Sequence, residues 1–121
     1  MEKIRISAFR IVNVEMKVND SPDNNRVTLS AETKFISRHP LDQNDKSGLM
    51  ELETTIQAED EEQFSMLFKT HVYFSFEEQP DNFDEFMKKE CYPLAEKKLY
   101  KAIRTITEAA GLNPLDLDRN K

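Results

Sequence analysis

The sequence predicts an α+β fold in which a four-stranded antiparallel sheet is followed by a short helix and a long C-terminal helix. Two observations support this prediction. Apolar residues alternate with other residues through four segments before residue 77, whereas the last third of the chain repeats them at spacings of three and four. Runs of strands followed by helices are typical of α+β proteins. At 121 residues the chain fits one domain, so we expect a single domain over residues 1–121.

The first strand is expected over residues 4–18, because apolar side chains at alternate positions predict one buried face. Arg10 interrupts this alternation, and Phe9 and Ile11 would point to the other face. A strand of this length is uncommon, so we expect a bend or bulge near Phe9–Arg10. The predicted buried face comprises Ile4, Ile6, Ala8, Val12, Val14, Met16 and Val18.

Three more strands follow, separated by a turn at 19–25, a long loop at 38–48 and an acidic turn at 59–62. The fourth strand is the most hydrophobic of the set. The strands are expected at residues 26–37, 49–59 and 63–76. Their apolar faces comprise Val27, Leu29, Ala31, Thr33 and Phe35 in the second strand, Met50, Leu52, Thr54, Ile56 and Ala58 in the third, and Phe64, Met66, Phe68, Thr70, Val72, Phe74 and Phe76 in the fourth.

The short helix is expected after Pro80, with Asp81 as its N-cap and with Phe83, Phe86 and Met87 on one side. We expect it to lead into the long helix through a segment that ends near the single cysteine.

The long helix is expected to begin at Cys91–Pro93, because proline is tolerated in the first helical turn. Gly111 and Pro114 would end it. Its apolar stripe needs a flat apolar surface, and the sheet is the candidate, within one subunit or across a subunit boundary. The stripe comprises Leu94, Ala95, Leu99, Ala102, Ile103, Ile106 and Ala110, and the solvated side comprises Glu96, Lys97, Lys101, Arg104 and Glu108.

The composition limits the functions that this chain can have. Hydrophobic residues make up 38% of the chain and charged residues 33%, so we expect a small core and a homo-oligomer, either a dimer or a tetramer, that buries further apolar surface. The net charge of −6 argues against nucleic acid as a partner. A basic cluster is therefore interpreted as a solvated helix face, and it comprises Lys88, Lys89, Lys97, Lys98, Lys101 and Arg104.

The sequence also favours a cytoplasmic location. Cys91 is the only cysteine, so no intrachain disulfide can form, which suits a reducing compartment. The first residues lack the apolar run of a signal peptide. No stretch approaches the roughly twenty apolar residues of a membrane span, so we expect no membrane partner.

No catalytic or metal-binding pattern is present, so we expect neither an enzyme nor a cofactor. His39 shares a loop with Asp42 and Asp45, but these residues match no strong ligand spacing, and a solvated loop histidine is favoured over a metal site. A nucleophilic pair of Cys91 and His71 would need a third, orienting group, so a packed cysteine is favoured. The two glycines of the chain are too few for a glycine-rich phosphate cradle.

Phenylalanine and methionine are concentrated in the fourth strand and the segment after it. A buried core is the favoured interpretation for most of these residues. The functional alternative is an adaptable apolar groove, because methionine is flexible and apolar contacts require no fixed hydrogen bonds. The candidate client-binding residues are Phe64, Met66, Phe68, Phe74, Phe76, Phe83, Phe86 and Met87.

Three short motifs resemble the SecB family of protein-export chaperones. Residues 111–117, Gly-Leu-Asn-Pro-Leu-Asp-Leu, are similar to the glycine-hydrophobe-x-proline-x-leucine-x-leucine segment that follows the family's main helix. Cys91-Tyr92-Pro93 resembles the Cys-Pro that opens this helix, and Ile6–Ile11 resembles the family's first strand. The order of elements also matches over almost the whole chain.

The resemblance implies a dimer of dimers with helices between sheets, and ATP-independent holding of unfolded preproteins along apolar grooves. Family members bind the export motor SecA partly through acidic residues on the first strand. At the aligned positions this chain has Asn13 and Lys17, so the resemblance does not support a SecA contact. The family continues into another helix, whereas this chain ends at Lys121, so part of the usual groove wall would be missing.

Three functions are therefore open from the sequence. The first is a SecB-like holdase that binds unfolded or nascent polypeptides. The second is a module dedicated to one partner such as an antitoxin, because relatives of the family include chaperones of toxin–antitoxin pairs. The third is a small-ligand binding protein or an enzyme with a pocket under the long helix.

Overall fold

The computed structural model describes residues 4–18, 29–40, 45–58 and 64–109. The chain divides into two compact units, Met1–Gln79 and Pro80–Lys121, and each is described by itself. The first unit holds the strands and the second holds the helices. The expected turns at 19–25 and 59–62, the tail motif at 111–117 and the expected helix stop at Gly111 lie outside the described residues.

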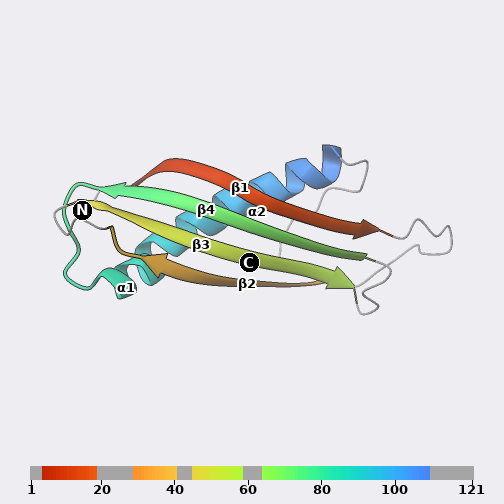
Figure 1. The fold of residues 1–121 in the computed structure, drawn as a ribbon, viewed down its shortest axis with the longest axis horizontal. Coiled ribbons are helices and arrows are strands. Elements are labelled where there is room, and N and C mark those ends of the chain that lie inside the picture. Colours follow the sequence, from red (N-terminus) through yellow and green to blue (C-terminus); the bar gives the residue numbers. More distant parts are fainter. Residues whose placement is uncertain (1–3, 19–28, 41–44, 59–63, 110–121) are drawn as a thin grey trace. The chain divides into compact units, whose positions relative to one another are not determined.

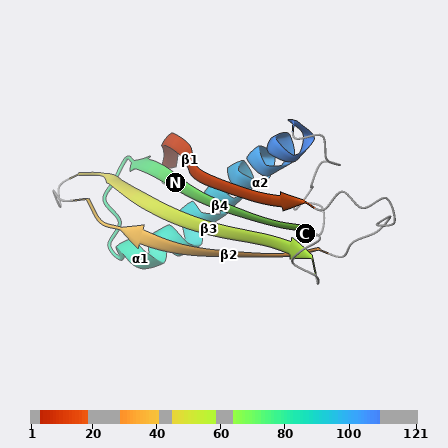
Figure 2. The ribbon, with the colours of Figure 1, turned by 45° about the vertical axis from the view of Figure 1, so that its right-hand side comes forward.

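The first unit is a four-stranded antiparallel sheet, as the sequence predicts (Figure 1). The strand order is β1-β4-β3-β2, so β1 and β2 form the two edges and β4 lies beside both β1 and β3, an arrangement that is also clear in Figure 2. The strands are β1 (Ile4–Val18), β2 (Leu29–Arg38), β3 (Ser47–Ala58) and β4 (Phe64–Phe76).

The two central strands bury alternate side chains, which confirms the predicted faces of β3 and β4. All the predicted face residues of β3 are buried, and those of β4 are buried from Met66 to Phe76. Two threonines lie among them. Thr54 shares a hydrogen bond of 3.0 Å with Thr33 on β2, whereas the hydroxyl of the fully buried Thr70 has no hydrogen-bond partner among the described residues.

The structure corrects the predicted face of β1. Instead of one irregularity near Phe9–Arg10, the pairing with β4 shifts register twice, between Ile6 and Ala8 and between Ile11 and Asn13. Each shift inserts one residue, and one inserted residue transfers the following side chains to the other face. Phe9 therefore pairs with Val72, a buried-face residue of β4, and does not point to the opposite face as expected.

The same two shifts explain which apolar residues of β1 share the buried face of β4. These residues lie opposite Phe76, Phe74, Val72, Thr70, Phe68 and Met66, and they are Ile4, Ile6, Phe9, Ile11, Val14 and Met16. Ala8 instead pairs with Tyr73 on the other face, and Val12 lies within the second shift. The prediction of a single uninterrupted face was wrong for these two residues.

The second unit contains α1 (Phe83–Phe86), the π-helical turn η1 (Met87–Cys91) and α2 (Tyr92–Ala109). The N-cap of α1 is Asn82 and not Asp81, because the Asn82 side chain accepts a hydrogen bond of 3.2 Å from the Glu85 backbone N–H. The two predicted helices are present, but no break separates them.

The π-helical turn η1 joins the two helices and ends at Cys91, two residues before Pro93. The Tyr92 backbone N–H donates to the Met87 carbonyl five residues earlier. In a continuous α-helix the ring of Pro93 would crowd the carbonyl four residues before it, and proline has no N–H for that carbonyl. The wider π turn accommodates the proline here, so the helical backbone need not begin at Cys91–Pro93.

The buried stripe of the helical segment follows a strict four-residue spacing. Its members are Met87, Cys91, Ala95, Leu99, Ile103 and Thr107. Leu94, which the sequence assigned to this stripe, is 41% exposed, and Thr107 is fully buried. Thr107 can be buried because its hydroxyl donates within the helix, at 2.9 Å to the Ile103 carbonyl. No helix among residues 83–109 is both long and apolar enough to cross a membrane.

Candidate functional site

Five of the eight sequence-predicted client-binding residues are buried. Met66, Phe68, Phe74 and Phe76 lie on one face of β4, and Met87 is fully buried in η1. The remaining three are half-buried: Phe64 at the start of β4, and Phe83 and Phe86 in α1. Client binding by this set stays a prediction, and the three half-buried residues are those that a partner can reach without rearrangement.

The exposed apolar side chains of the described sheet are concentrated on β1. Val14 is 41% exposed and Met16 is 38% exposed, although both belong to the face that is buried on β4. Cross-strand pairing places Val14 opposite Phe68 and Met16 opposite Met66, so the half-buried Phe64 is close to Met16 on the same face. Val14, Met16 and Phe64 are called the β1 edge patch below.

Sequence reasoning missed the exposure of Val14 and Met16 because it placed both on the predicted buried face of the first strand. The residue pattern of an edge strand and that of a central strand can be the same. Exposure depends on which strand has a neighbour on only one side, and within the described sheet β1 pairs with β4 alone.

The other face of the sheet, called the open face, carries a row of polar and charged residues that crosses all four strands. Lys69 on β4 lies between Asn13 on β1 and Glu53 on β3, and Glu53 in turn lies opposite Lys34 on β2. Opposite charges on neighbouring strands stabilise the pairing modestly.

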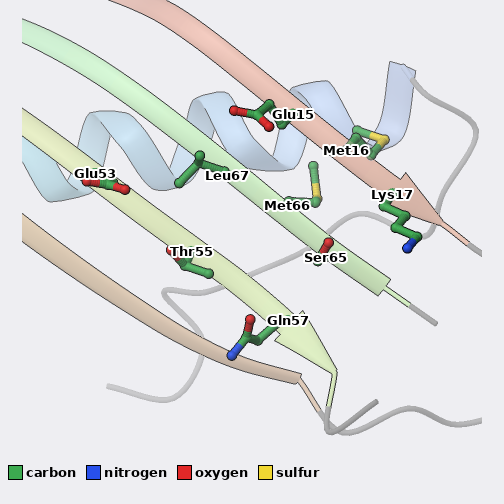
Figure 3. Close-up of a pocket in the computed structure, with 9 residues that line it drawn as sticks. All are labelled: Glu15, Met16, Lys17, Glu53, Thr55, Gln57, Ser65, Met66 and Leu67. Atoms are coloured by element: carbon green, nitrogen blue, oxygen red, sulfur yellow. The ribbon is translucent and has the colours of Figure 1, made fainter. Parts of the chain in front are cut away.

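A hollow of about 500 Å³ lies towards the end of the sheet where β1 finishes and β4 begins (Figure 3). Glu53, Thr55 and Gln57 line it from β3, and Glu15 and Lys17 line it from β1. β4 completes the lining with Ser65, Met66 and Leu67, and β1 with Met16. Its mixture of charges, amides and hydroxyls does not form a cluster of catalytic groups.

A second hollow, of about 390 Å³, also involves Glu53 and is more apolar. The exposed side chains of Val12 and Ile36 contribute to it from the two edge strands. Val12 is the residue inserted at the second register shift of β1, and its side chain lines this hollow on the open face. The charged residues that line this second hollow are Lys34, Glu51, Glu53 and Lys69, and His71 also lines it.

The clearest electrostatic interaction in this region joins Arg38 and Glu51. The Arg38 guanidinium donates through Nε to Oε2 and through Nη2 to Oε1 of Glu51. This hydrogen bonding lowers the pKa of Glu51 below its ordinary value, although partial burial opposes the shift, and the positive character of Arg38 and His71 adds to it. The pair fixes β2 against β3 and does not create a reactive carboxyl group.

The described residues contain no cluster of three metal-ligating side chains. Asp42, which the sequence places in a loop with His39 and Asp45, lies outside them. Cys91 is a buried thiol, so it is not presented to solvent as a nucleophile.

Neither a protein-family model nor a curated protein matches this sequence. Among solved structures, the chain is similar to the Mycobacterium tuberculosis SecB-like chaperone Rv1957, solved in complex with a ChAD peptide from the HigA1 antitoxin Rv1956. The TM-score is 0.71 at 12% sequence identity, and the match covers 94% of this chain and 85% of that chain. The fold is SecB-like. The likeness at this identity shows the fold alone, and it agrees with the strand–helix order that the sequence predicts.

Proposed function

We propose that this protein is a SecB-like chaperone that holds unfolded or nascent polypeptides in the cytoplasm without ATP, a cofactor or an enzymatic reaction. The SecB-like fold over 94% of the chain is the observation that carries this proposal. The β1 edge patch supports it, because it supplies exposed apolar surface on an otherwise highly charged chain. We further propose that residues 1–121 act as a single SecB-like domain.

The β1 edge patch would contact clients through non-directional apolar burial. Roughly 40% of Val14 and Met16 remains to be buried, which contributes about 1 kcal/mol or less for each side chain. Such small contributions give weak, sequence-tolerant binding, which suits a holdase. Phe64, Phe83 and Phe86 would add contacts, and the five buried candidate residues would take part only after local opening.

Homo-oligomers would enlarge this apolar surface. β1 is an edge strand, and an edge presents backbone groups that can pair with another strand. Pairing of two β1 edges around a two-fold axis would place two β1 edge patches on one continuous face. We therefore propose a dimer or a tetramer, and light scattering that gives only a monomer at micromolar concentration would contradict this part.

Suppression of aggregation tests the holdase function. A chemically denatured client is diluted into buffer with stoichiometric amounts of the protein, and light scattering is followed over time. We expect suppression by the unaltered chain and a clear loss with Met16→Glu or Val14→Glu. Ile36→Glu is the matched control, because Ile36 is 58% exposed on the other edge strand and outside the patch.

Absence of suppression, together with absence of client binding by calorimetry, would end the holdase proposal. Equal losses of aggregation suppression for Met16→Glu and Ile36→Glu would show that suppression depends on exposed apolar surface in general. That result would contradict a specific role of the β1 edge patch. Circular dichroism of each variant separates loss of binding from loss of folding.

A module dedicated to one partner is the second candidate function. Rv1957, the structural neighbour, was solved with a peptide from an antitoxin, so an antitoxin is a candidate partner here too. A pull-down from the native host separates the two functions. One dominant co-purifying protein favours the dedicated module, whereas many unrelated polypeptides favour the holdase. SecA is not proposed as a partner, because the resemblance to the family aligns Asn13 and Lys17 with the acidic residues through which its members partly bind SecA.

A further inference from the structure

The open face of the sheet carries four basic side chains that form no ion pair with another described residue. They are Arg5, Arg10 and Lys17 on β1 and Lys69 on β4. All four are exposed, and the ladder between β1 and β4 places them on the same side of the sheet. Their charges are therefore available to a partner.

The part of the open face formed by β2 and β3 is close to neutral. Arg38 binds Glu51 through two hydrogen bonds, and the ammonium group of Lys34 lies 3.6 Å from the carboxylate of Glu32. Glu53 is the third acidic residue of this half. Three acidic and two basic side chains give the β2–β3 half a net charge of −1, and most of that charge is already paired.

The part formed by β1 and β4 is positive. Its described residues include one acidic side chain, Glu15, against the four basic ones, so this half carries a net charge of +3 with histidine counted as neutral. The complete chain carries −6. A positive region on an acidic protein attracts an acidic partner and orients it during encounter.

An apolar side chain lies among these positive charges. Val12 is 45% exposed, and it lines the hollow of about 390 Å³ together with Lys69 and His71. Arg10 pairs with His71 in the ladder, so Arg10 borders the same hollow. The β1–β4 half thus presents two cations beside an aliphatic contact.

The open face stays accessible in an assembled protein. In the dimer of dimers that the SecB resemblance implies, helices lie between sheets, so each sheet turns one face outward. Charged side chains without partners favour the outward face, which is the open face here. Pairing of two β1 edges adds strands in the plane of the sheet and covers neither of its faces.

We propose that the β1–β4 half of the open face binds an acidic polypeptide segment that carries an aliphatic side chain between its carboxylates. The carboxylates pair with Arg10 and Lys69, and the aliphatic side chain packs on Val12. The apolar contact removes water and so strengthens the neighbouring ion pairs. Such a partner is opposite in charge to one that acidic residues on β1 would attract. The surface lies on the other side of the sheet from the β1 edge patch, and the inference does not depend on the proposed function.

The chemistry of the face disfavours two other occupants. A nucleic acid would meet Glu32 and Glu53 on the adjoining half, and Val12 offers a phosphate no favourable contact. The open face of a second copy offers the β1–β4 half only its own β2–β3 half, in which two of the three carboxylates are already paired. An acidic polypeptide uses both the cations and the valine.

Fluorescence anisotropy with the full chain tests the proposal. The probe is a fluorescein-labelled synthetic peptide in which glutamates flank a single leucine. One control peptide replaces each glutamate by glutamine, and a second replaces the leucine by glycine. The test variant is Arg10→Glu/Lys69→Glu. The matched control is Lys46→Glu/Lys88→Glu, which changes the net charge equally at exposed residues before β3 and in η1.

We expect the Kd for the leucine-containing acidic peptide to rise at least about tenfold in the Arg10→Glu/Lys69→Glu variant and to change little in the control, because only the former reverses the charges beside the hollow. Val12→Ser should weaken binding of the leucine peptide and leave binding of the glycine peptide unchanged. Arg10→Gln/Lys69→Gln repeats the test if the charge reversal perturbs folding.

Similar weakening in both charge-reversed variants would show that binding depends on overall charge, and it would overturn the proposal. Equal binding of the glutamine peptide would do the same, as would tighter binding of a single-stranded oligonucleotide that is lost in Arg10→Glu/Lys69→Glu. A second copy as the occupant would appear as a lower molar mass of that variant in light scattering, and this result would also contradict the proposal.

Discussion

Arg38 on β2 and Glu51 on β3 are joined by two hydrogen bonds between the guanidinium and the carboxylate. They are diagonal neighbours, because Arg38 pairs with Leu49 and Glu51 pairs with Ile36 in the ladder. A bidentate contact of this kind fixes both side chains and links an edge strand to the centre of the sheet.

The Arg38–Glu51 pair predicts a pH-dependent part of the stability. The folded-state pKa of Glu51 is below its ordinary value of 4.5, so the ionised carboxylate stabilises the fold above that pH. This contribution is lost as the pH falls through the lower, folded-state pKa. Urea unfolding should therefore show a difference between the unaltered chain and Glu51→Gln at pH 7 that shrinks towards pH 3. Glu78→Gln, at an exposed position after β4, is the control, and a Glu51→Gln difference that stays constant with pH would contradict the prediction.

Thr70→Val should stabilise the sheet. The Thr70 hydroxyl is fully buried and finds no hydrogen-bond partner in the part of the chain that the structure describes, and valine has nearly the same shape without the polar group. Removing an unsatisfied buried hydroxyl should raise the free energy of unfolding by about 1 kcal/mol. Thr54→Val is the matched control: Thr54 is equally buried but bonded to Thr33, so this change should lower the free energy by about 1 kcal/mol. A change of the same sign in the free energy of unfolding for both variants, measured by denaturant titration, would contradict the different hydrogen bonding of Thr70 and Thr54.

Two isoleucines distinguish the core from the exposed edge. Ile56 on β3 is fully buried, whereas Ile36 on β2 is 58% exposed. Ile56→Ala should lower the free energy of unfolding by about 2–5 kcal/mol, because it removes buried methyl groups and leaves a cavity. Ile36→Ala should change it by less than about 0.5 kcal/mol. Comparable losses, measured by chemical denaturation, would show that the two sites have similar environments.

The N-cap of α1 can be tested with neighbouring residues. Asn82→Ala removes the acceptor for the Glu85 backbone N–H and should cost about 0.5–2 kcal/mol of stability. Asp81→Ala, at the position that the sequence favoured, should have little effect. Thermal unfolding of the two variants measures the loss of Tm for each. A larger loss for Asp81→Ala would show that Asp81 is the N-cap, as the sequence predicted.

The sequence alone determined the element types, because hydrophobic periodicity reports the local backbone directly. The buried faces of β3 and, from Met66 to Phe76, of β4 could be predicted from the sequence, since a central strand with neighbours on both sides buries the face that its alternation marks. The SecB-like order of strands and helices was predictable in the same way, and the structural comparison agrees with it.

The tertiary structure decided which apolar residues are exposed. In β1, apolar residues occur at both odd and even positions, so only the pairing with β4 shows where the two register shifts lie. The edge position of β1 then leaves Val14 and Met16 exposed, although their local pattern resembles that of a buried strand. In α2, the buried stripe includes Thr107 and omits Leu94. Periodicity alone does not predict which of these neighbouring faces of the helix is turned towards the core. Local pattern reports backbone geometry, whereas exposure depends on which neighbours the chain brings to each side chain.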